Sequence, residues 1–129
     1  MPAAASIRVL VVDDQAAMRA LTKSSLQQLG FVDISDAIDG EDGLRVAQAK
    51  RAQLIISDFN MPKMDELDFL RAIRTIPDTQ SAAFIMLTER ADKELVQRAV
   101  QFGVNNYLVK PFTIAQLKQK LEEVFGALT

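Results

Sequence analysis

The chain of 129 residues contains no cysteine, no histidine and no tryptophan. The lack of cysteine excludes disulfide bonds and thiolate metal sites. The lack of histidine removes the commonest general base and the commonest transition-metal ligand. Any metal ion held by side chains of this protein must therefore be bound through oxygen, which favours Mg²⁺, with Mn²⁺ or Ca²⁺ as substitutes.

An excess of positive charge and a long apolar run are also missing. Lysine and arginine number 15 against 17 aspartates and glutamates, for a formal net charge of −2, so we expect no nucleic-acid partner. The apolar run Val9–Val12 is far too short to cross a membrane. Residues 1–6 lack the basic and apolar regions of a signal peptide. We expect a cytoplasmic protein without membrane insertion.

The length and a hydrophobic fraction of 49% suit one domain over residues 1–129, with a core over about residues 7–128. Short apolar runs, typical of parallel strands buried on both faces, recur along the chain. These runs are Ile7–Val12, Leu54–Ser57, Ala83–Leu87 and Tyr107–Val109. Val32–Ala37 mixes apolar and acidic residues, which predicts an edge strand.

Amphipathic segments lie between and after these runs. Thr113 and Gln116 predict a capping box. Asp65 is the expected N-cap of another helix, and Gly30 and Gly103 are expected to end two helices as C-terminal caps. The expected apolar stripes are Met18, Leu21 and Leu29; Leu44 and Ala47; Leu67, Leu70 and Ile73; Leu95, Val96, Ala99 and Val100; and Ile114, Leu117, Leu121, Val124, Phe125 and Leu128.

Five β–α units of this kind predict an α/β fold, with a doubly wound, five-stranded parallel sheet and helices on both faces. In such sheets ligands bind beyond the carboxyl ends of the strands. Polar residues appear where the apolar runs stop: Asp13 and Asp14, Asp58, Thr88, and Lys110. We therefore expect these five side chains to share one edge of the sheet.

Each of these residue types has a use in phosphoryl transfer. Clustered carboxylates repel one another, and Mg²⁺ relieves that repulsion. Asp58 is the candidate nucleophile, because carboxylates form aspartyl-phosphates. Lys110 supplies positive charge, and the Thr88 hydroxyl is placed to bond a phosphoryl oxygen.

Taken singly, the same residues also have structural interpretations. An acidic pair after a strand is often a helix N-cap, so Asp14 is a candidate cap. Asp58 alone could be a turn residue. Lys110 alone is more typical of a solvated surface lysine, and Tyr107 alone is more typical of an aromatic residue packed in the core. The joint pattern at successive strand ends favours the shared phosphoryl site.

On these residues the chain resembles the response-regulator receiver family, and within it the single-domain chemotaxis members. The resemblance covers nearly the whole chain. The matching segments are Val11–Asp14, Asp58–Pro62, Met86–Thr88 and Tyr107–Thr113.

The resemblance implies a flavodoxin-like fold with strand order 2-1-3-4-5 and five helices. It implies Asp58 as phosphoacceptor, with Asp13, Asp14, Asp58 and the backbone carbonyl of Asn60 as Mg²⁺ ligands. It further implies that Thr88 and Tyr107 form a switch pair and that Lys110 contacts the phosphate. The Lys110–Pro111 bond is expected to be cis.

Two residues depart from the family pattern. Glu66 stands where glycine is common, which implies an altered loop or a strained residue. Glu89 stands where a small residue usually follows the threonine. We expect Glu89 to slow phosphorylation by small phosphodonors; the alternatives are that it pairs with Lys110 or Arg90, or points to solvent. Asn60 and Arg90 are expected to tune phosphate lifetime.

The partners implied are a sensor histidine kinase or phosphotransfer protein, and a downstream protein target. The target is expected on the face of the fourth helix, fifth strand and fifth helix, near Phe112. Unless the sequence is an excised fragment, the lack of an output domain after Thr129 predicts that the output is protein binding. By resemblance, the expected pathway is of the chemotaxis or motility kind.

Two other functions stay open at this point. One is a phosphate-independent adaptor, which Glu66 and Glu89 suggest. The other is a haloacid-dehalogenase-type phosphatase, an enzyme that also uses an aspartyl-phosphate. That class has a second acid two residues after the nucleophile, where this chain has Asn60.

Overall fold

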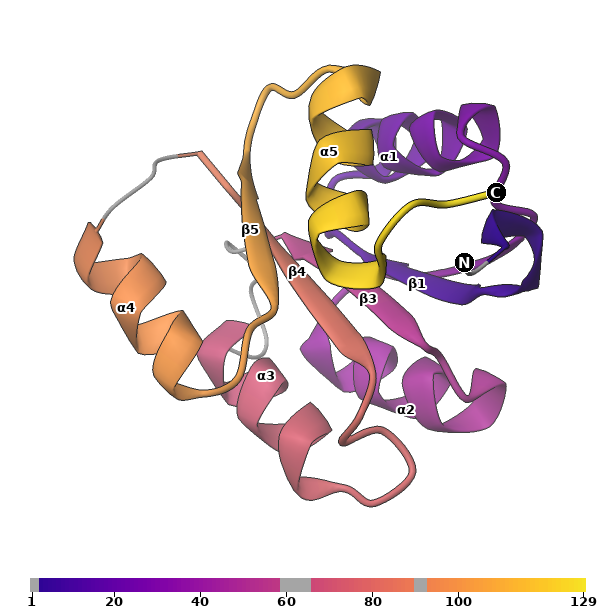
Figure 1. Ribbon diagram of the computed structural model, residues 1–129. Helices are drawn as coiled ribbons and strands as arrows, with labels where there is room; N and C mark the ends of the chain where they lie inside the picture. Colours follow the sequence, from indigo (N-terminus) through magenta and orange to yellow (C-terminus); the bar gives the residue numbers. More distant parts are fainter. Residues whose placement is uncertain (1–2, 59–65, 90–92) are drawn as a thin grey trace.

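The computed structural model describes residues 3–58, 66–89 and 93–129. Their strands form a single parallel sheet with helices on both faces (Figure 1). The strand order is β2-β1-β3-β4-β5, as the family resemblance implied. The strands are β1 (Arg8–Val12), β2 (Asp33–Ala37), β3 (Leu54–Asp58), β4 (Ala83–Thr88) and β5 (Asn106–Val109).

Five α-helices and one short 3₁₀-helix accompany the sheet in the described residues. α1 and α5 cover one face, while α2, α3 and α4 lie on the other (Figure 1). None of these helices has the length and apolar character needed to cross a bilayer. The helices are η1 (Ala4–Ser6), α1 (Ala16–Gln28), α2 (Gly40–Lys50), α3 (Glu66–Thr75), α4 (Lys93–Gln101) and α5 (Ile114–Phe125).

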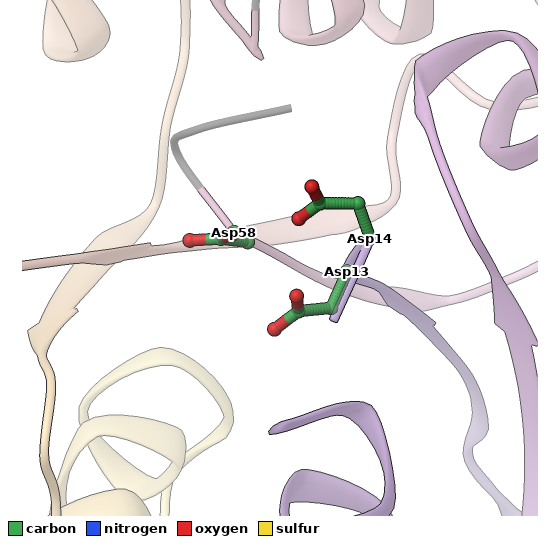
Figure 2. Close-up of side chains that lie close together, drawn as sticks. All are labelled: Asp13, Asp14 and Asp58. Atoms are coloured by element: carbon green, nitrogen blue, oxygen red, sulfur yellow. The ribbon is translucent and has the colours of Figure 1, made fainter. Parts of the chain in front are cut away.

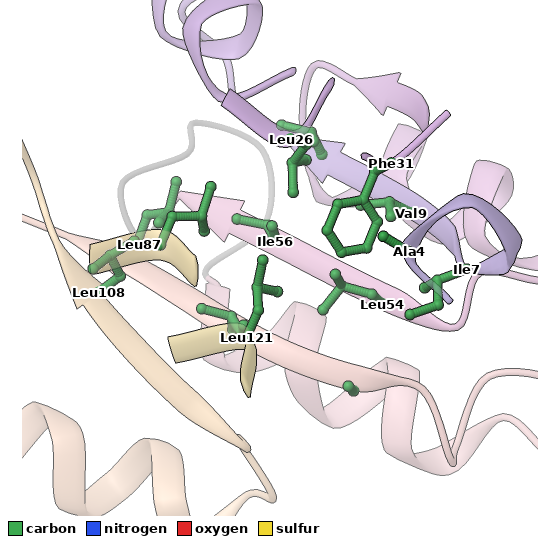
Figure 3. Close-up of a cluster of buried hydrophobic side chains, with 14 residues drawn as sticks. Ala4, Ile7, Val9, Leu26, Phe31, Leu54, Ile56, Leu87, Leu108 and Leu121 are labelled. Atoms are coloured by element: carbon green, nitrogen blue, oxygen red, sulfur yellow. The ribbon is translucent and has the colours of Figure 1, made fainter. Parts of the chain in front are cut away.

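The core is divided by the sheet because successive side chains of a strand point to opposite faces. In β3, Leu54 and Ile56 belong to the cluster under α1 and α5, whereas Ile55 belongs to the cluster under α2 and α3. Figure 3 shows the first cluster, in which Leu26 of α1 and Leu121 of α5 close over the strands. Both faces of β3 are thus buried, which explains its unbroken apolar sequence.

Two apolar residues lie on the outside, contrary to the predicted stripes. Leu21 of α1 is 51% exposed, and Val100 of α4 is 60% exposed. The buried stripe of α1 runs through Thr22, Ser25 and Leu26 instead, so Leu21 faces solvent. Periodicity alone did not distinguish these two neighbouring stripes.

The predicted caps of the described helix ends are present. Thr113 accepts a hydrogen bond from the Gln116 amide, and the Gln116 side chain accepts one from the Thr113 amide, which completes the capping box. Gly30 and Gly103 follow α1 and α4 with φ values of 101° and 95°, where glycine avoids the strain of a side chain. The predicted cap Asp65 lies outside the described residues.

Arg74, in the last turn of α3, ties together the edge of the sheet opposite to the strand carboxyl ends. Its guanidinium donates to the carbonyls of Gly103, Gln80 and Ala82 at 2.5 to 3.1 Å, and to Oδ1 of Asn105 at 2.9 Å. The same Asn105 oxygen accepts from the Phe84 amide at 2.8 Å. One cation thus links α3, the start of β4 and the loop before β5.

Candidate functional site

Two neighbouring strands bring three carboxylates together at the carboxyl edge of the sheet. Asp13 and Asp14 directly follow β1, and Asp58 is the last residue of β3. β1 and β3 are paired in register up to Val12 and Ser57, so the residues that follow these two lie side by side. One oxygen from each of the three carboxylates lies within 4.8 Å of the others, and Figure 2 shows the three side chains gathered there.

Asp13 is the most enclosed of the three acids. Its side chain has no exposed surface, and its Oδ1 accepts a hydrogen bond from the Gln15 amide at 2.9 Å. Its Oδ2 is buried without a hydrogen-bond partner among the described residues. Burial raises the pKa of Asp13, and the charge of Asp58 raises it further, against the lowering effects of the Gln15 amide and Lys110.

Lys110 provides the positive charge of the site. Its Nζ lies 2.8 Å from Oδ1 of Asp58, and the two side chains are only 9% and 5% exposed. The Lys110 amide donates to the carbonyl of Thr88 at 2.7 Å, which fixes the lysine against the end of β4. The Lys110–Pro111 peptide bond is cis, as the resemblance implied.

Thr88 and Tyr107, the predicted switch pair, lie on the neighbouring strands β4 and β5. Thr88 is 4% exposed at the carboxyl end of β4. Tyr107 is half-buried on β5, paired in register with Met86. Nζ of Lys120, on α5, lies 4.8 Å from the centre of the Tyr107 ring, a cation–π contact at the outer edge of the sheet.

The cap interpretation of Asp14 is wrong. The N-cap residue of α1 is Gln15, and no side chain caps this helix. The acid that contacts the start of the helix is Asp13, through the Gln15 amide. Asp14 is exposed, which leaves its carboxylate available at the mouth of the site.

Sequence reasoning missed one residue of this site, Arg19 of α1. Its Nη1 donates to the backbone carbonyl of Asp13 at 2.8 Å, and its Nε lies 3.2 Å from Oδ2 of Asp36 on β2. Lys23 also contacts Asp36, at 3.4 Å. Arg19 therefore fixes the peptide that joins Asp13 to Asp14, although no sequence pattern separates it from an ordinary surface arginine.

The two departures from the family pattern fall in different places. Glu89 is exposed, and it forms no ion pair with Lys110, whose ammonium pairs with Asp58. Glu66 is the first residue of α3. Asn60 and Arg90 lie outside the described residues. The expected Asn60 carbonyl ligand and the expected pair of Arg90 with Glu89 therefore stay predictions.

The donor set fits a hard divalent cation. Three carboxylates face one ammonium, and the unpartnered Asp13 oxygen is an acceptor without a donor in the described part of the chain. Buried acceptors of this kind are costly unless a cation or a donor satisfies them. The arrangement combines three clustered carboxylates with a lysine and a place for a cation, a set of groups consistent with phosphoryl transfer to an aspartate.

Comparison with known proteins identifies the family. Residues 9–122 match the model of the response regulator receiver domain. The chain belongs to this family. Receivers are phosphoacceptor domains rather than enzymes, which excludes the dehalogenase-type phosphatase.

The receiver is similar over its whole length to chemotaxis proteins. It is 54% identical to a Rhizobium etli protein named "Probable chemotaxis protein CheY", over 99% of each chain. It is 37% identical to chemotaxis protein CheY-3 of Vibrio cholerae, over 95% of each chain. Because of its identity to these two relatives over nearly the whole chain, the protein is a CheY-like receiver.

Solved receiver structures agree with the fold. Chemotaxis protein CheY4 of Vibrio cholerae matches with a TM-score of 0.86 and 35% identity, over 92% of this chain and 98% of that one. The receiver domain of a sensor histidine kinase from Pseudomonas aeruginosa PAO1 matches with a TM-score of 0.83 and 28% identity, over 94% and 98%. That second structure has a magnesium ion coordinated in its active-site cleft.

Proposed function

We propose that this receiver accepts a phosphoryl group on Asp58 from a histidine kinase or phosphotransfer protein. The contact between Lys110 Nζ and Asp58 Oδ1 at 2.8 Å, beside two further carboxylates, carries this proposal. Asp13, Asp14 and Asp58 would hold a Mg²⁺ ion, with the Asn60 carbonyl as the further ligand that the family resemblance implies. Its positive charge would offset the carboxylates and the incoming phosphoryl group.

Each protein group has a defined part in the transfer. An Asp58 carboxylate oxygen attacks phosphorus, and the leaving group departs with its bonding electron pair. Lys110, now beside Asp58, turns its ammonium to the phosphoryl oxygens. Thr88, buried at the carboxyl end of β4, would offer its hydroxyl to a phosphoryl oxygen.

The response to phosphorylation is expected on the outer face of α4, β5 and α5. A phosphoryl group adds about −1.5 to −2 charges, and Thr88 and Tyr107 are the proposed link from that charge to the face. Val100 and Val109 on this face are 60% and 36% exposed, which supports a protein target there. The chemotaxis relatives support a role in cytoplasmic chemotaxis or motility signalling.

Mass spectrometry after incubation with acetyl phosphate and Mg²⁺ tests the phosphoacceptor. The native chain should gain one phosphoryl group, sensitive to hydroxylamine as an acyl phosphate is, and should gain none with excess EDTA. Asp58→Asn should stay unmodified. Asp78→Asn, in the exposed loop before β4 at the opposite edge, is the matched control and should label like the native chain.

Equal labelling of the native chain and Asp58→Asn would show that another residue accepts the phosphate. Failure of the native chain to label with any donor, kinase included, would favour the phosphate-independent adaptor instead.

A further inference from the structure

A surface cavity lies at the edge of the sheet opposite to the phosphoacceptor. The strands β1, β3 and β4 begin there, and α5 ends beside them. The cavity has a volume of about 450 Å³, and small-molecule sites usually have about 300 to 1,000 Å³. Its lining includes Arg8, Arg51, Gln53, Asp78, Ser81 and Phe125.

Unused hydrogen-bond donors gather in this cavity. The Nε of Arg8 donates to the carbonyl of Arg51 at 2.9 Å, while its two Nη atoms have no partner in residues 3–58, 66–89 and 93–129. Oε1 of Gln53 accepts from the Arg8 amide at 3.0 Å, and its Nε2 is unpaired among the same residues. The Arg51 guanidinium and the Ser81 hydroxyl also lack a partner there. A ligand that supplies acceptors therefore suits this cavity.

The charges of the lining favour a single anion. Arg8 and Arg51 contribute two positive charges, and Asp78 contributes one negative charge. Asp78 forms no ion pair with either arginine in the described part of the chain, so both guanidinium groups stay available. A carboxylate matches the one positive charge in excess, and its two oxygens fit the paired Nη atoms of a guanidinium.

The backbone of Arg51 holds the Arg8 side chain in place. Arg51 ends α2 with a φ of 52°, in the left-handed conformation that a helix usually gives to glycine. In this conformation its carbonyl accepts the hydrogen bond from Arg8 Nε. The Arg8 guanidinium is thus positioned before a ligand arrives, which lowers the entropic cost of binding. Phe125, partly buried at the end of α5, adds an apolar wall to the same cavity.

We propose that this cavity binds a small organic acid, with its one carboxylate at Arg8 and Arg51 and its apolar body against Phe125. The site goes beyond the proposed phosphorylation, because none of the described lining residues belongs to the phosphoacceptor site. A ligand bound there joins the starts of three strands to the end of α5. It therefore stabilises the folded chain and gives the domain a chemical input at the end opposite to Asp58.

Benzoate is the probe, because it carries one carboxylate on an apolar ring. Its binding to the native chain is measured by calorimetry and by amide NMR titration, at low ionic strength and with EDTA, so that no cation occupies the phosphoacceptor site. Benzoate should bind saturably and should shift the amides of Arg8, Gln53 and Ser81 most. Benzamide, which has the same shape without the charge, should not bind. Phenyl phosphate should bind more weakly than benzoate, because a dianion exceeds the positive charge of the cavity and meets Asp78.

Three variants test the sign of each charge. Arg51→Gln removes a positive charge and should weaken benzoate binding by about 3- to 10-fold. Asp78→Asn removes the opposing negative charge and should strengthen benzoate binding by about two- to threefold. Arg98→Gln, an exposed change on α4, is the matched control and should bind benzoate like the native chain.

Benzoate binding that does not saturate, or that Arg51→Gln leaves unchanged, overturns the proposal. Equal binding of benzamide also overturns it, because the charge would then play no part. Tighter binding of phenyl phosphate overturns the assignment to a carboxylate, and amide shifts centred on Asp13 and Lys110 overturn the location. If Arg51→Gln does not fold, Asp78→Asn supplies the charge test, and weaker binding by that variant overturns the proposal.

Discussion

Lys110 and Asp58 form an ion pair across strand β4, although they come from strands that do not touch. Asp58 ends β3 and Lys110 follows β5, and β4 lies between these strands. The pair is almost fully removed from solvent, where an ion pair that loses one partner leaves a costly unpaired charge.

Replacing Lys110 by methionine should weaken phosphorylation and strengthen cation binding. The variant lacks the positive charge that faces the phosphoryl oxygens, so labelling by acetyl phosphate should slow by about 10- to 100-fold. Mg²⁺ should bind several-fold more tightly by calorimetry, because the ammonium no longer repels it. Lys118→Met, an exposed change on α5, is the control; a slowdown below about twofold would contradict the assigned role of Lys110.

Replacing Asp13 by asparagine should stabilise the metal-free protein while removing its response to Mg²⁺. Asparagine keeps an oxygen for the Gln15 amide and removes a buried charge beside Asp58. We expect the free energy of unfolding in urea with EDTA to rise by about 1 to 2 kcal/mol. Mg²⁺ should then stabilise the native chain but not the variant. Asp33→Asn, exposed on β2, should change neither quantity, and a variant less stable than native in EDTA would refute this account.

Asp42 should make the start of α2 sensitive to acid. A hydrogen bond from Arg45 lowers the pKa of Asp42 from 3.8, and the Ile38 amide lowers it further. The fold therefore favours the ionised form, so its contribution is complete above pH 3.8 and is lost as the pH falls through the lower folded-state pKa. Asp42→Asn should cost roughly 0.5 kcal/mol near pH 7.

The test of Asp42 is a series of urea titrations from pH 7 to pH 3 for both proteins. The difference between them should shrink at the acid end. Arg45→Met should reproduce most of the loss at neutral pH, whereas a difference that is independent of pH would rule the mechanism out.

Gly43 should not tolerate alanine, although it lies within helix α2. An added Cβ would lie 3.0 Å from Cζ of Phe69 and 3.1 Å from Cγ2 of Val12. The gain in helix propensity, about 1 kcal/mol, is smaller than typical overpacking costs of about 1 to 3 kcal/mol. Thermal and urea unfolding should show a net loss of about 1 kcal/mol. Ala49→Gly, on the exposed side of α2, is the control and measures the effect of helix propensity alone. A Gly43→Ala protein that is more stable than native would contradict the prediction and show that Phe69 moves aside freely.

The sheet and most of the site could be predicted because both follow from local pattern. Buried parallel strands are continuously apolar, so the residue at which the run stops marks the functional edge, as for Asp13 and Asp58. Parallel pairing then brings residues from distant parts of the sequence together. The sequence separation between Asp13 and Asp58 did not have to be explained, because parallel strands place their carboxyl ends at the same edge whatever the length of the connection.

The remainder depends on tertiary contacts that no local pattern records. The helical stripes did not show that Leu21 faces solvent, because α1 buries Thr22 and Ser25 with Leu26. The role of Arg19 depends on how far a long side chain reaches from α1 to the Asp13 carbonyl. The sequence offered Asp14 as a candidate cap of α1, whereas Asp13 contacts the Gln15 amide; the two acids are adjacent, and the turn between them sets which one points inward.

The guanidinium of Arg74 gives the two strands β4 and β5 a common fixed point at the end farthest from Asp58. Because it holds the carbonyls of Ala82 and Gly103 together with Asn105, these strands cannot slide past each other there. We therefore expect any displacement of Thr88 on phosphorylation to be largest at the carboxyl ends of β4 and β5, where Lys110 lies, and smallest beneath Arg74.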